Sequence, residues 1–120
     1  MQVKECKHFD ICGNHVSVKS RHLECPKCAT IRKRYGITLE TRNGMMEEQN
    51  SCCAICDCEV EFYNTAEDNP KGFERAVVDH NHDTGDVRAI LCHSCNVALG
   101  LLGEDPNRLM RMYSYIREFN

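Results

Sequence analysis

The sequence has 120 residues and a formal net charge of −3, with 42% hydrophobic and 28% charged residues and no tryptophan. This length allows one compact domain or two very small metal-held modules, but it excludes two domains with independent apolar cores. No apolar run reaches the roughly 18 residues of a membrane helix, and charged residues fill the N-terminal stretch where a secretory signal would be apolar. We therefore expect a globular cytoplasmic protein without a membrane partner.

Charge divides the sequence into a basic and an acidic part. Residues 1–38 contain eight Lys or Arg and three Asp or Glu, a net charge of +5, whereas residues 39–120 contain seven and fifteen, a net charge of −8. The basic part includes a cluster formed by Lys27, Arg32, Lys33 and Arg34. Such a cluster is typical of a surface that binds nucleic acid, although a solvated basic turn has the same composition.

Cysteine is the most unusual feature of the composition, with ten residues in 120. In the reducing cytosol, metal binding explains so many thiols better than disulfides do. Three pairs have the Cys-x-x-Cys spacing, in which a tight turn directs two sulfurs at one point about 2.3 Å away. Structural zinc needs four such ligands and contributes on the order of 10 kcal/mol or more, so a fold held by zinc requires little apolar core.

The spacing predicts two zinc sites. The N-terminal site combines one Cys-x-x-Cys pair with two upstream cysteines, giving Cys6, Cys12, Cys25 and Cys28, although one upstream ligand could be replaced by His8, His15 or His22. The second site joins the two remaining pairs, Cys53, Cys56, Cys92 and Cys95. Cys52 and Cys58 lie beside this second set and are interpreted as surplus, although they could compete for the metal.

The middle of the chain predicts a helix, a loop and a hairpin. Thr38 is a suitable N-cap for a helix that runs from Leu39 to about Gln49. Residues 65–72 are polar, contain Pro and Gly, and predict a surface loop. Residues 76–78 and 87–91 are apolar runs on either side of a Gly-containing turn, a pattern that indicates a β-hairpin.

Two helices are expected at the C-terminal end. The first covers residues 96–102 and ends at Gly103; the second begins with Asp105 as N-cap and Pro106 in its first turn. The last helix carries a stripe of large side chains: Leu109, Met112, Tyr113, Ile116 and Phe119. We interpret this stripe as core-facing; a stripe larger than one small domain can cover would instead be a dimer interface.

The candidate chemistry lies between the last two cysteine pairs. Asp79 and His80 end the first hairpin strand, and Asn96 begins the helix that the second zinc site would anchor. A carboxylate, an imidazole and an amide oxygen would thereby meet, and such a set can hold a hard cation and activate water.

The motifs resemble the phage recombination endonuclease VII family within the HNH, or His-Me finger, nucleases. The matching residues are Gln49-Asn50, Cys53-x-x-Cys56, Asp79-His80-Asn81-His82, Thr84-Gly85, Val87-Arg88, Leu91-Cys92-x-x-Cys95-Asn96 and Ala98-Leu99-Gly100. The similarity as a whole extends from about Tyr35 to about Ile116, and Ala89 departs from the glycine that is usual in the family. The resemblance implies a small α+β fold. A zinc-stabilised ββα-metal core and a C-terminal helix (residues 35–120) would follow a basic zinc-ribbon-like module (residues 1–34).

The resemblance also implies a DNA endonuclease. Asp79 and Asn96 would hold a magnesium ion, for which manganese could substitute, and His80 would be the general base. His82 would either act in the site or form the turn, and Arg88 would either clamp a phosphate or remain an exposed hairpin residue. A non-catalytic zinc-ribbon module that binds nucleic acid is the alternative. Branched, nicked and linear DNA substrates, and a monomer or a homodimer in a phage-infected bacterium, all remain open.

Overall fold

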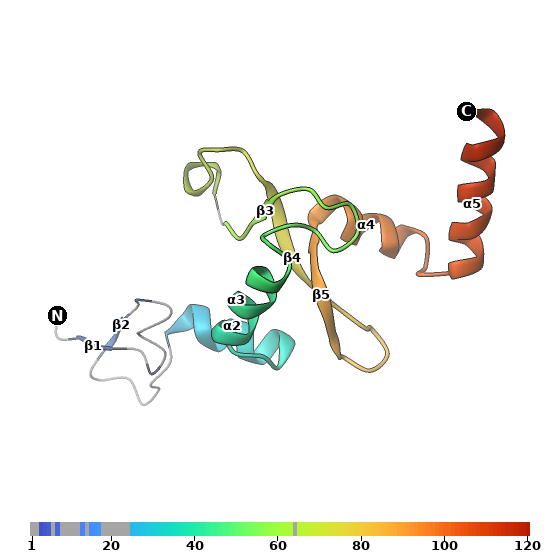
Figure 1. Ribbon diagram of the computed structural model, residues 1–120. Helices are drawn as coiled ribbons and strands as arrows, with labels where there is room; N and C mark the ends of the chain where they lie inside the picture. Colours follow the sequence, from blue (N-terminus) through green and yellow to red (C-terminus); the bar gives the residue numbers. More distant parts are fainter. Residues whose placement is uncertain (1–2, 6, 8–12, 14, 18–24, 64) are drawn as a thin grey trace.

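The computed structural model describes residues 3–5, 7, 13, 15–17, 25–63 and 65–120 (Figure 1). The elements in chain order are β1 (Val3–Glu5), β2 (His15–Ser17), α2 (Pro26–Tyr35), α3 (Leu39–Glu48), β3 (Val60–Glu61), the 3-10 helix η1 (Ala66–Asp68), β4 (Glu74–His80), β5 (Val87–Cys92), α4 (His93–Leu101) and α5 (Pro106–Phe119). β1 and β2 form an antiparallel pair, and a second sheet has the order β3-β4-β5. The expected α+β class is confirmed.

The predicted hairpin is the centre of the molecule. β4 and β5 pair antiparallel with Ala76 opposite Cys92, and the register shifts between Asp79 and His80. β3 joins the other edge of β4 in parallel. α4 follows β5 directly and packs against both strands of the hairpin, completing a β-β-α unit (Figure 1). This helix begins before the expected residue Asn96, because the Cys92 sulfur caps it by accepting a hydrogen bond from the Cys95 N–H.

Among the described residues, two helices precede the three-stranded sheet, and only one of them follows from the sequence pattern. α3 starts and ends as predicted, with Thr38 Oγ1 accepting a hydrogen bond from the Thr41 N–H at 3.1 Å. α2 occupies the segment that was predicted only as a basic cluster. It begins with Pro26 in its first turn and ends at Gly36, whose φ of +70° allows its N–H to reach the Arg32 carbonyl. The expected module boundary between residues 34 and 35 therefore falls within this helix.

Most of the buried side chains among the described residues form two small clusters, and each contains cysteines. The first cluster consists of Cys25, Cys28, Ile31 and Leu39. The second lies under the hairpin and consists of Cys53, Val60, Ala76, Ile90, Leu91 and Cys92. So few large apolar residues provide little hydrophobic stabilisation, as expected for a fold in which metal sites replace part of the core.

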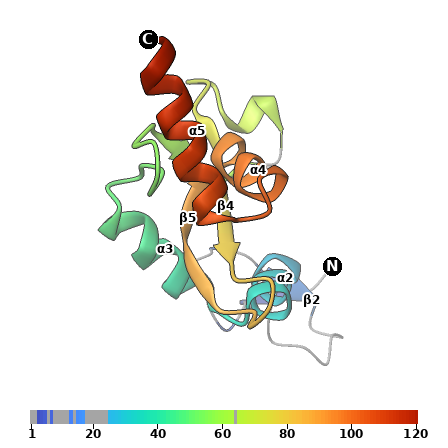
Figure 2. The ribbon, with the colours of Figure 1, turned by 90° about the vertical axis from the view of Figure 1, so that its right-hand side faces the viewer.

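The C-terminal helix does not complete the core. In Figure 1, α5 lies at the far end of the molecule, beyond the connection that follows α4, and in Figure 2 it is the element nearest the viewer. None of its residues is buried. The interpretation of its apolar stripe as core-facing is therefore wrong. The turn at Gly103 and Glu104, both with positive φ, directs the helix away from the hairpin. In the described part of the chain, every helix is too short or too polar to cross a membrane.

Candidate functional site

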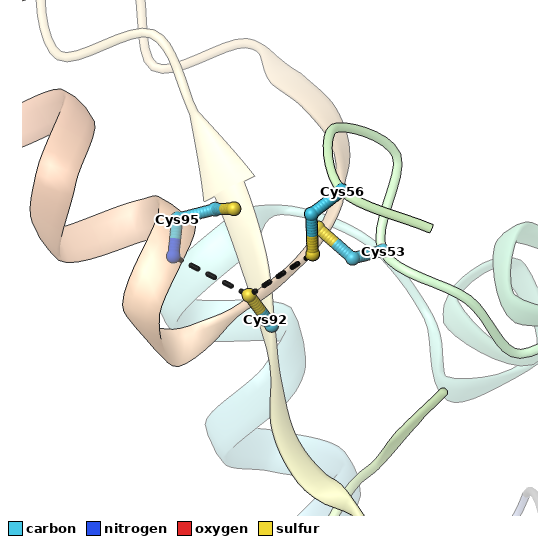
Figure 3. A group of neighbouring side chains, drawn as sticks. All are labelled: Cys53, Cys56, Cys92 and Cys95. Carbon is cyan, nitrogen blue, oxygen red and sulfur yellow. Dashed lines mark hydrogen bonds between the residues drawn. The ribbon is translucent and has the colours of Figure 1, made fainter. Parts of the chain in front are cut away.

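Four cysteine side chains converge where the loop before β3 meets the junction of β5 and α4. The sulfur atoms of Cys53, Cys56, Cys92 and Cys95 all lie within 4.8 Å of one another (Figure 3). The Cys56 and Cys92 sulfurs are 3.8 Å apart, close to the edge of a tetrahedron with Zn–S bonds of about 2.3 Å. The structure therefore brings together the second predicted quartet in a form that can hold zinc.

Backbone geometry positions both cysteine pairs. Cys53 and Cys56 lie in a tight turn, in which the Asp57 N–H donates to the Cys53 carbonyl at 3.0 Å and Asp57 has a φ of +64°. The other pair uses the start of α4, with Cys92 as N-cap and Cys95 in the first turn. A metal held by all four would fasten the loop to the hairpin and to α4.

The ionisation of these thiols fits a cation site. Burial alone would raise the pKa of Cys53, but hydrogen bonds from the backbone at Cys56, Cys92 and Ile55 lower it to about 6. Burial and the neighbouring thiols raise the pKa of Cys95. Four neighbouring thiolates repel one another, so that burial and repulsion oppose the ionisation of all four. A divalent ion bound among them would stabilise the fully ionised form.

The remaining cysteines lie outside the four-sulfur cluster or outside the described residues. Cys58 is half-buried. Its pKa is raised to about 12, chiefly by hydrogen bonding with Cys56 and to a smaller extent by desolvation. The Cys52 sulfur lies 3.3 Å from the Asn50 carbonyl. Neither belongs to the four-sulfur cluster. Cys25 and Cys28 are buried at the start of α2, whereas Cys6 and Cys12 lie outside the described residues.

Gln49 joins the cysteine turn to the hairpin. Its amide nitrogen donates to the Cys52 carbonyl at 2.9 Å and to the Ile90 carbonyl at 2.8 Å, and its amide oxygen accepts from the Ile90 N–H at 3.0 Å. β5 is the edge strand of its sheet, so these bonds cover backbone groups that no neighbouring strand pairs. The motif Gln49-Asn50 was noted in the sequence, but its structural role was not predicted.

Asp79 and His80 lie at the end of β4, as the hairpin pattern predicts. Asp79 is only 6% exposed, and both of its oxygens accept hydrogen bonds from Arg88, at 2.6 and 3.1 Å. The His80 ring lies 4.8 Å from the His82 ring and 6.2 Å from the Tyr35 ring, between centroids. Asn96 is half-buried in the first turn of α4, the helix that packs on β4.

Arg88 is held between two carboxylates. Besides Asp79, Arg88 forms an ion pair with Glu104, in which the guanidinium nitrogen and the carboxylate oxygen are 2.7 Å apart. Glu104 follows α4, and this contact was not predicted from the sequence. Hydrogen bonding to Asp79 and then to Glu104 raises the pKa of Arg88, and the pKa of Glu104 is lowered in return. An ionised carboxylate can accept about four hydrogen bonds or metal contacts, so Asp79 retains capacity for a cation beside Arg88.

The turn between the hairpin strands is built around Asn81. Its side-chain oxygen accepts hydrogen bonds from the N–H groups of Asp83 and Thr84 at 2.8 and 3.1 Å. Gly85, with a φ of +80°, closes the turn by donating to the Asn81 carbonyl. Asn81 is thus a turn-forming residue, and His82 is exposed beside it.

The basic residues expected to contact nucleic acid lie on α2. Lys27, Arg32, Lys33 and Arg34 are all exposed there. α2 contacts α3, and Tyr35 at its end approaches His80. The basic helix and the end of the hairpin are therefore neighbours.

Comparison with known proteins identifies the family. The model of recombination endonuclease VII matches residues 28–118. The chain belongs to this family. It is also 36% identical over 85 residues to the Gene 59 protein of Mycobacterium phage D29, an alignment that covers 70% of this chain but 46% of that relative, so the chain spans less than half of the phage protein.

A solved structure also matches the chain. It is the ββα-Me type II restriction endonuclease Hpy99I, with a TM-score of 0.44 and 24% identity, over 98% of this chain and 66% of that one.

The family model confirms the predicted resemblance to endonuclease VII. The region that it matches contains the hairpin, α4 and the cysteine cluster.

Proposed function

We propose that this chain is a DNA endonuclease that hydrolyses phosphodiester bonds with a divalent metal ion. One observation carries the proposal: in a member of the endonuclease VII family, Asp79 and His80 end the strand against which α4, with Asn96 in its first turn, is packed. The four-cysteine cluster at the base of α4 supports a fixed arrangement of these residues.

Asp79 and Asn96 would hold the catalytic ion, magnesium or manganese, while structural zinc would occupy the four-cysteine cluster. The donor sets fit this division, because thiolates suit zinc whereas carboxylate and amide oxygens suit magnesium. When bound, the magnesium ion would stabilise negative charge on the reacting phosphate and on the leaving 3′ oxygen. The expected products carry 5′-phosphate and 3′-hydroxyl ends.

His80 would take the proton from the attacking water. A neutral imidazole accepts protons near pH 7, and such a base accelerates reactions by roughly 10² to 10⁴-fold. His82 lies close enough to affect the His80 ring and would be an auxiliary residue of the site. Arg88 would serve chiefly to orient Asp79, because two bonds tie it to that carboxylate; a phosphate could approach its remaining N–H groups.

Exposed cations on α2 would position the DNA backbone: Lys27, Arg32, Lys33 and Arg34. Phosphate contacts of this kind fix a protein on its substrate without reading sequence. The basic residues 1–34 would act as a module with its own zinc, held by Cys6, Cys12, Cys25 and Cys28, ahead of the nuclease domain of residues 35–120. The protein would act on phage or host DNA, branched or nicked, in the bacterial cytoplasm.

The exposed face of α5 supports a homodimer. Leu109, Met112, Tyr113, Ile116 and Phe119 are between 36% and 69% exposed. At roughly 200 Å² for a fully exposed side chain of this size, the stripe presents about 500 Å². That lies in the upper part of the roughly 300 to 600 Å² spanned by the largest apolar patch of a typical monomer. It is also a large part of the roughly 800 Å² that each partner buries in a stable complex.

The test is cleavage of labelled DNA by zinc-loaded protein across a magnesium titration. Replacing Asp79 with Asn or Asn96 with Ala should raise the magnesium concentration required, whereas His80→Ala should lower the maximal rate at least 100-fold at every magnesium concentration. His93→Ala, at an exposed histidine on α4, is the matched control and should cleave as wild type does. Equal rates for wild type and His80→Ala would contradict the assigned base.

A further inference from the structure

A groove with a cavity volume of about 600 Å³ lies between α2, α3 and the β3–β4 side of the sheet. Four cations line it: Lys27, Arg34, Arg42 and Arg75. Three aromatic residues also line it: Tyr35, Phe62 and Tyr63. Its described lining contains no acidic residue. This composition is suited to a ligand that carries both negative charge and flat rings.

Two of the arginines stack on the aromatic rings. The Arg42 guanidinium carbon lies 3.9 Å from the centre of the Phe62 ring, and that of Arg75 lies 4.8 Å from the Tyr63 ring. A stacked guanidinium keeps its N–H groups directed sideways in its own plane, where they can donate to phosphate oxygens. Stacking therefore does not consume these donors.

Arg42 is the most buried of the four groove cations, and one of its donors is unsatisfied. Its Nε atom is buried and has no hydrogen-bond partner among the described residues, a condition that costs about 1 to 3 kcal/mol for a buried donor. Desolvation by burial lowers the pKa of Arg42, although nearby groups, including Glu61, partly offset this. An anion bound in the groove would offset part of this desolvation cost through its electrostatic attraction to the Arg42 guanidinium.

The other three cations are also available. Lys27, Arg34 and Arg75 are exposed and form no ion pair with a carboxylate of the described chain, in contrast to Arg88. Glu61 is opposite Arg75 in the register of β3 and β4, yet the two do not form an ion pair. The groove thus retains its positive potential.

One end of the groove reaches the proposed catalytic residues. Tyr35 lines the groove, and its ring centre lies 6.2 Å from that of His80. Val78, also in the lining, precedes His80 on β4 by two positions. A strand that enters the groove could therefore continue directly to the phosphate beside His80.

We propose that this groove binds an unpaired nucleic-acid strand that extends from the cleavage site, an inference that rests on the proposed nuclease function. Lys27, Arg34, Arg42 and Arg75 hold its phosphates, and a base stacks against the face of Tyr63 that Arg75 does not cover. The volume is in the range of small-ligand pockets, roughly 300 to 1,000 Å³, which suits individual nucleotides and not a duplex. Combined stacking and phosphate contact is how proteins bind single strands.

The test is fluorescence anisotropy with a labelled 20-nucleotide oligothymidine and with a labelled 20-base-pair duplex, without added magnesium or chelator so that zinc is retained. The variants are Arg34→Gln/Arg75→Gln and Tyr63→Ala. Lys71→Gln/Arg117→Gln removes the same charge at exposed positions outside the groove and is the matched control.

Each phosphate contact with a single strand contributes about 0.7 to the slope of log K against log salt concentration. Loss of two contacts should therefore reduce the magnitude of this slope by about 1.4. Tyr63→Ala should weaken single-strand binding roughly 5- to 100-fold and duplex binding much less. Circular dichroism and zinc content should match wild type for all three variants. The control double variant should retain nearly all of the wild-type salt slope.

The outcomes separate this proposal from the proposed function. Suppose that wild type cleaves DNA but the groove variants bind the single strand as tightly as wild type or the control variant does. The proposal that the groove binds a single strand is then overturned, whereas the proposed nuclease function is retained. If wild type cleaves nothing, the nuclease assignment fails, and the binding measurement still decides whether the groove holds a single strand. Equal losses on single strand and duplex would overturn the preference for an unpaired strand.

Discussion

Replacing Gln49 with Leu tests how the cysteine turn is fastened to the hairpin. The side chain forms three hydrogen bonds, two of which involve the backbone of Ile90. Ile90 is fully buried, so its N–H would lose its partner without gaining water. Its carbonyl would remain satisfied by the Ala54 N–H at 3.1 Å. The cost therefore falls on the Ile90 N–H and on the Cys52 carbonyl.

The magnitude follows from those two groups. An orphaned buried N–H costs about 1 to 3 kcal/mol and a lost hydrogen bond about 1 kcal/mol, so Gln49→Leu should lower the free energy of unfolding by about 2 to 4 kcal/mol. That is a large fraction of the roughly 5 to 15 kcal/mol of an ordinary domain. Gln49→Glu, which keeps the shape but directs a second oxygen at two carbonyls, should cost at least as much at pH 7.

The assay is urea unfolding at a fixed free zinc concentration, since zinc binding contributes to apparent stability. Glu48→Gln, at the adjacent exposed residue of α3, is the control and should stay within about 0.5 kcal/mol of wild type. A loss below about 0.5 kcal/mol for both Gln49 variants would refute the reasoning that these bonds secure the edge of β5.

Three further predictions concern zinc, charge and assembly. Cys92→Ser should reduce zinc content at the four-cysteine site and unfold the β-β-α unit, as should a strong chelator; unchanged circular dichroism after that zinc is lost would contradict the structural role. Because Arg88 lowers the pKa of Glu104, that ion pair stabilises the fold above the unfolded pKa and loses its effect as pH falls through the lowered value. The stability difference between wild type and Glu104→Gln should therefore be larger at pH 7 than at pH 3, and an equal difference at both would refute the pairing. Leu109→Asp/Ile116→Asp should convert a dimer to a monomer in light scattering, with α5 still helical; an unchanged mass would exclude this face as the interface.

The sequence predicted the elements whose signals are local. The cap at Thr38, the hairpin turn and the Asp105-Pro106 start each depend on residues within a few positions, and all three are observed. The Cys-x-x-Cys spacing likewise predicted the quartet that includes Cys53 and Cys92, because a tetrahedral metal site needs two such pairs.

The features that were missed depend on long-range contacts or on competing interpretations. α2 begins within a Cys-x-x-Cys pair, a spacing that was interpreted as a tight turn for metal binding and not as the start of a helix. Glu104 reaches Arg88 across 16 residues, which no sequence period indicates. The stripe on α5 has the same periodicity whether it faces a core or a partner, so only its exposure in the structure could distinguish the two.

The most direct measurement of the central claim is gel-resolved cleavage of a four-way junction and its matching linear duplex, in magnesium, by zinc-loaded wild type and by folded, zinc-loaded His80→Ala. The account predicts that wild type cleaves at least one of the two DNAs, leaving 5′-phosphate ends, and that His80→Ala leaves both intact over the same time. The ratio between the substrates would show whether branching is recognised. Wild-type protein that binds both DNAs and cleaves neither would contradict the account and favour a non-catalytic nucleic-acid-binding module.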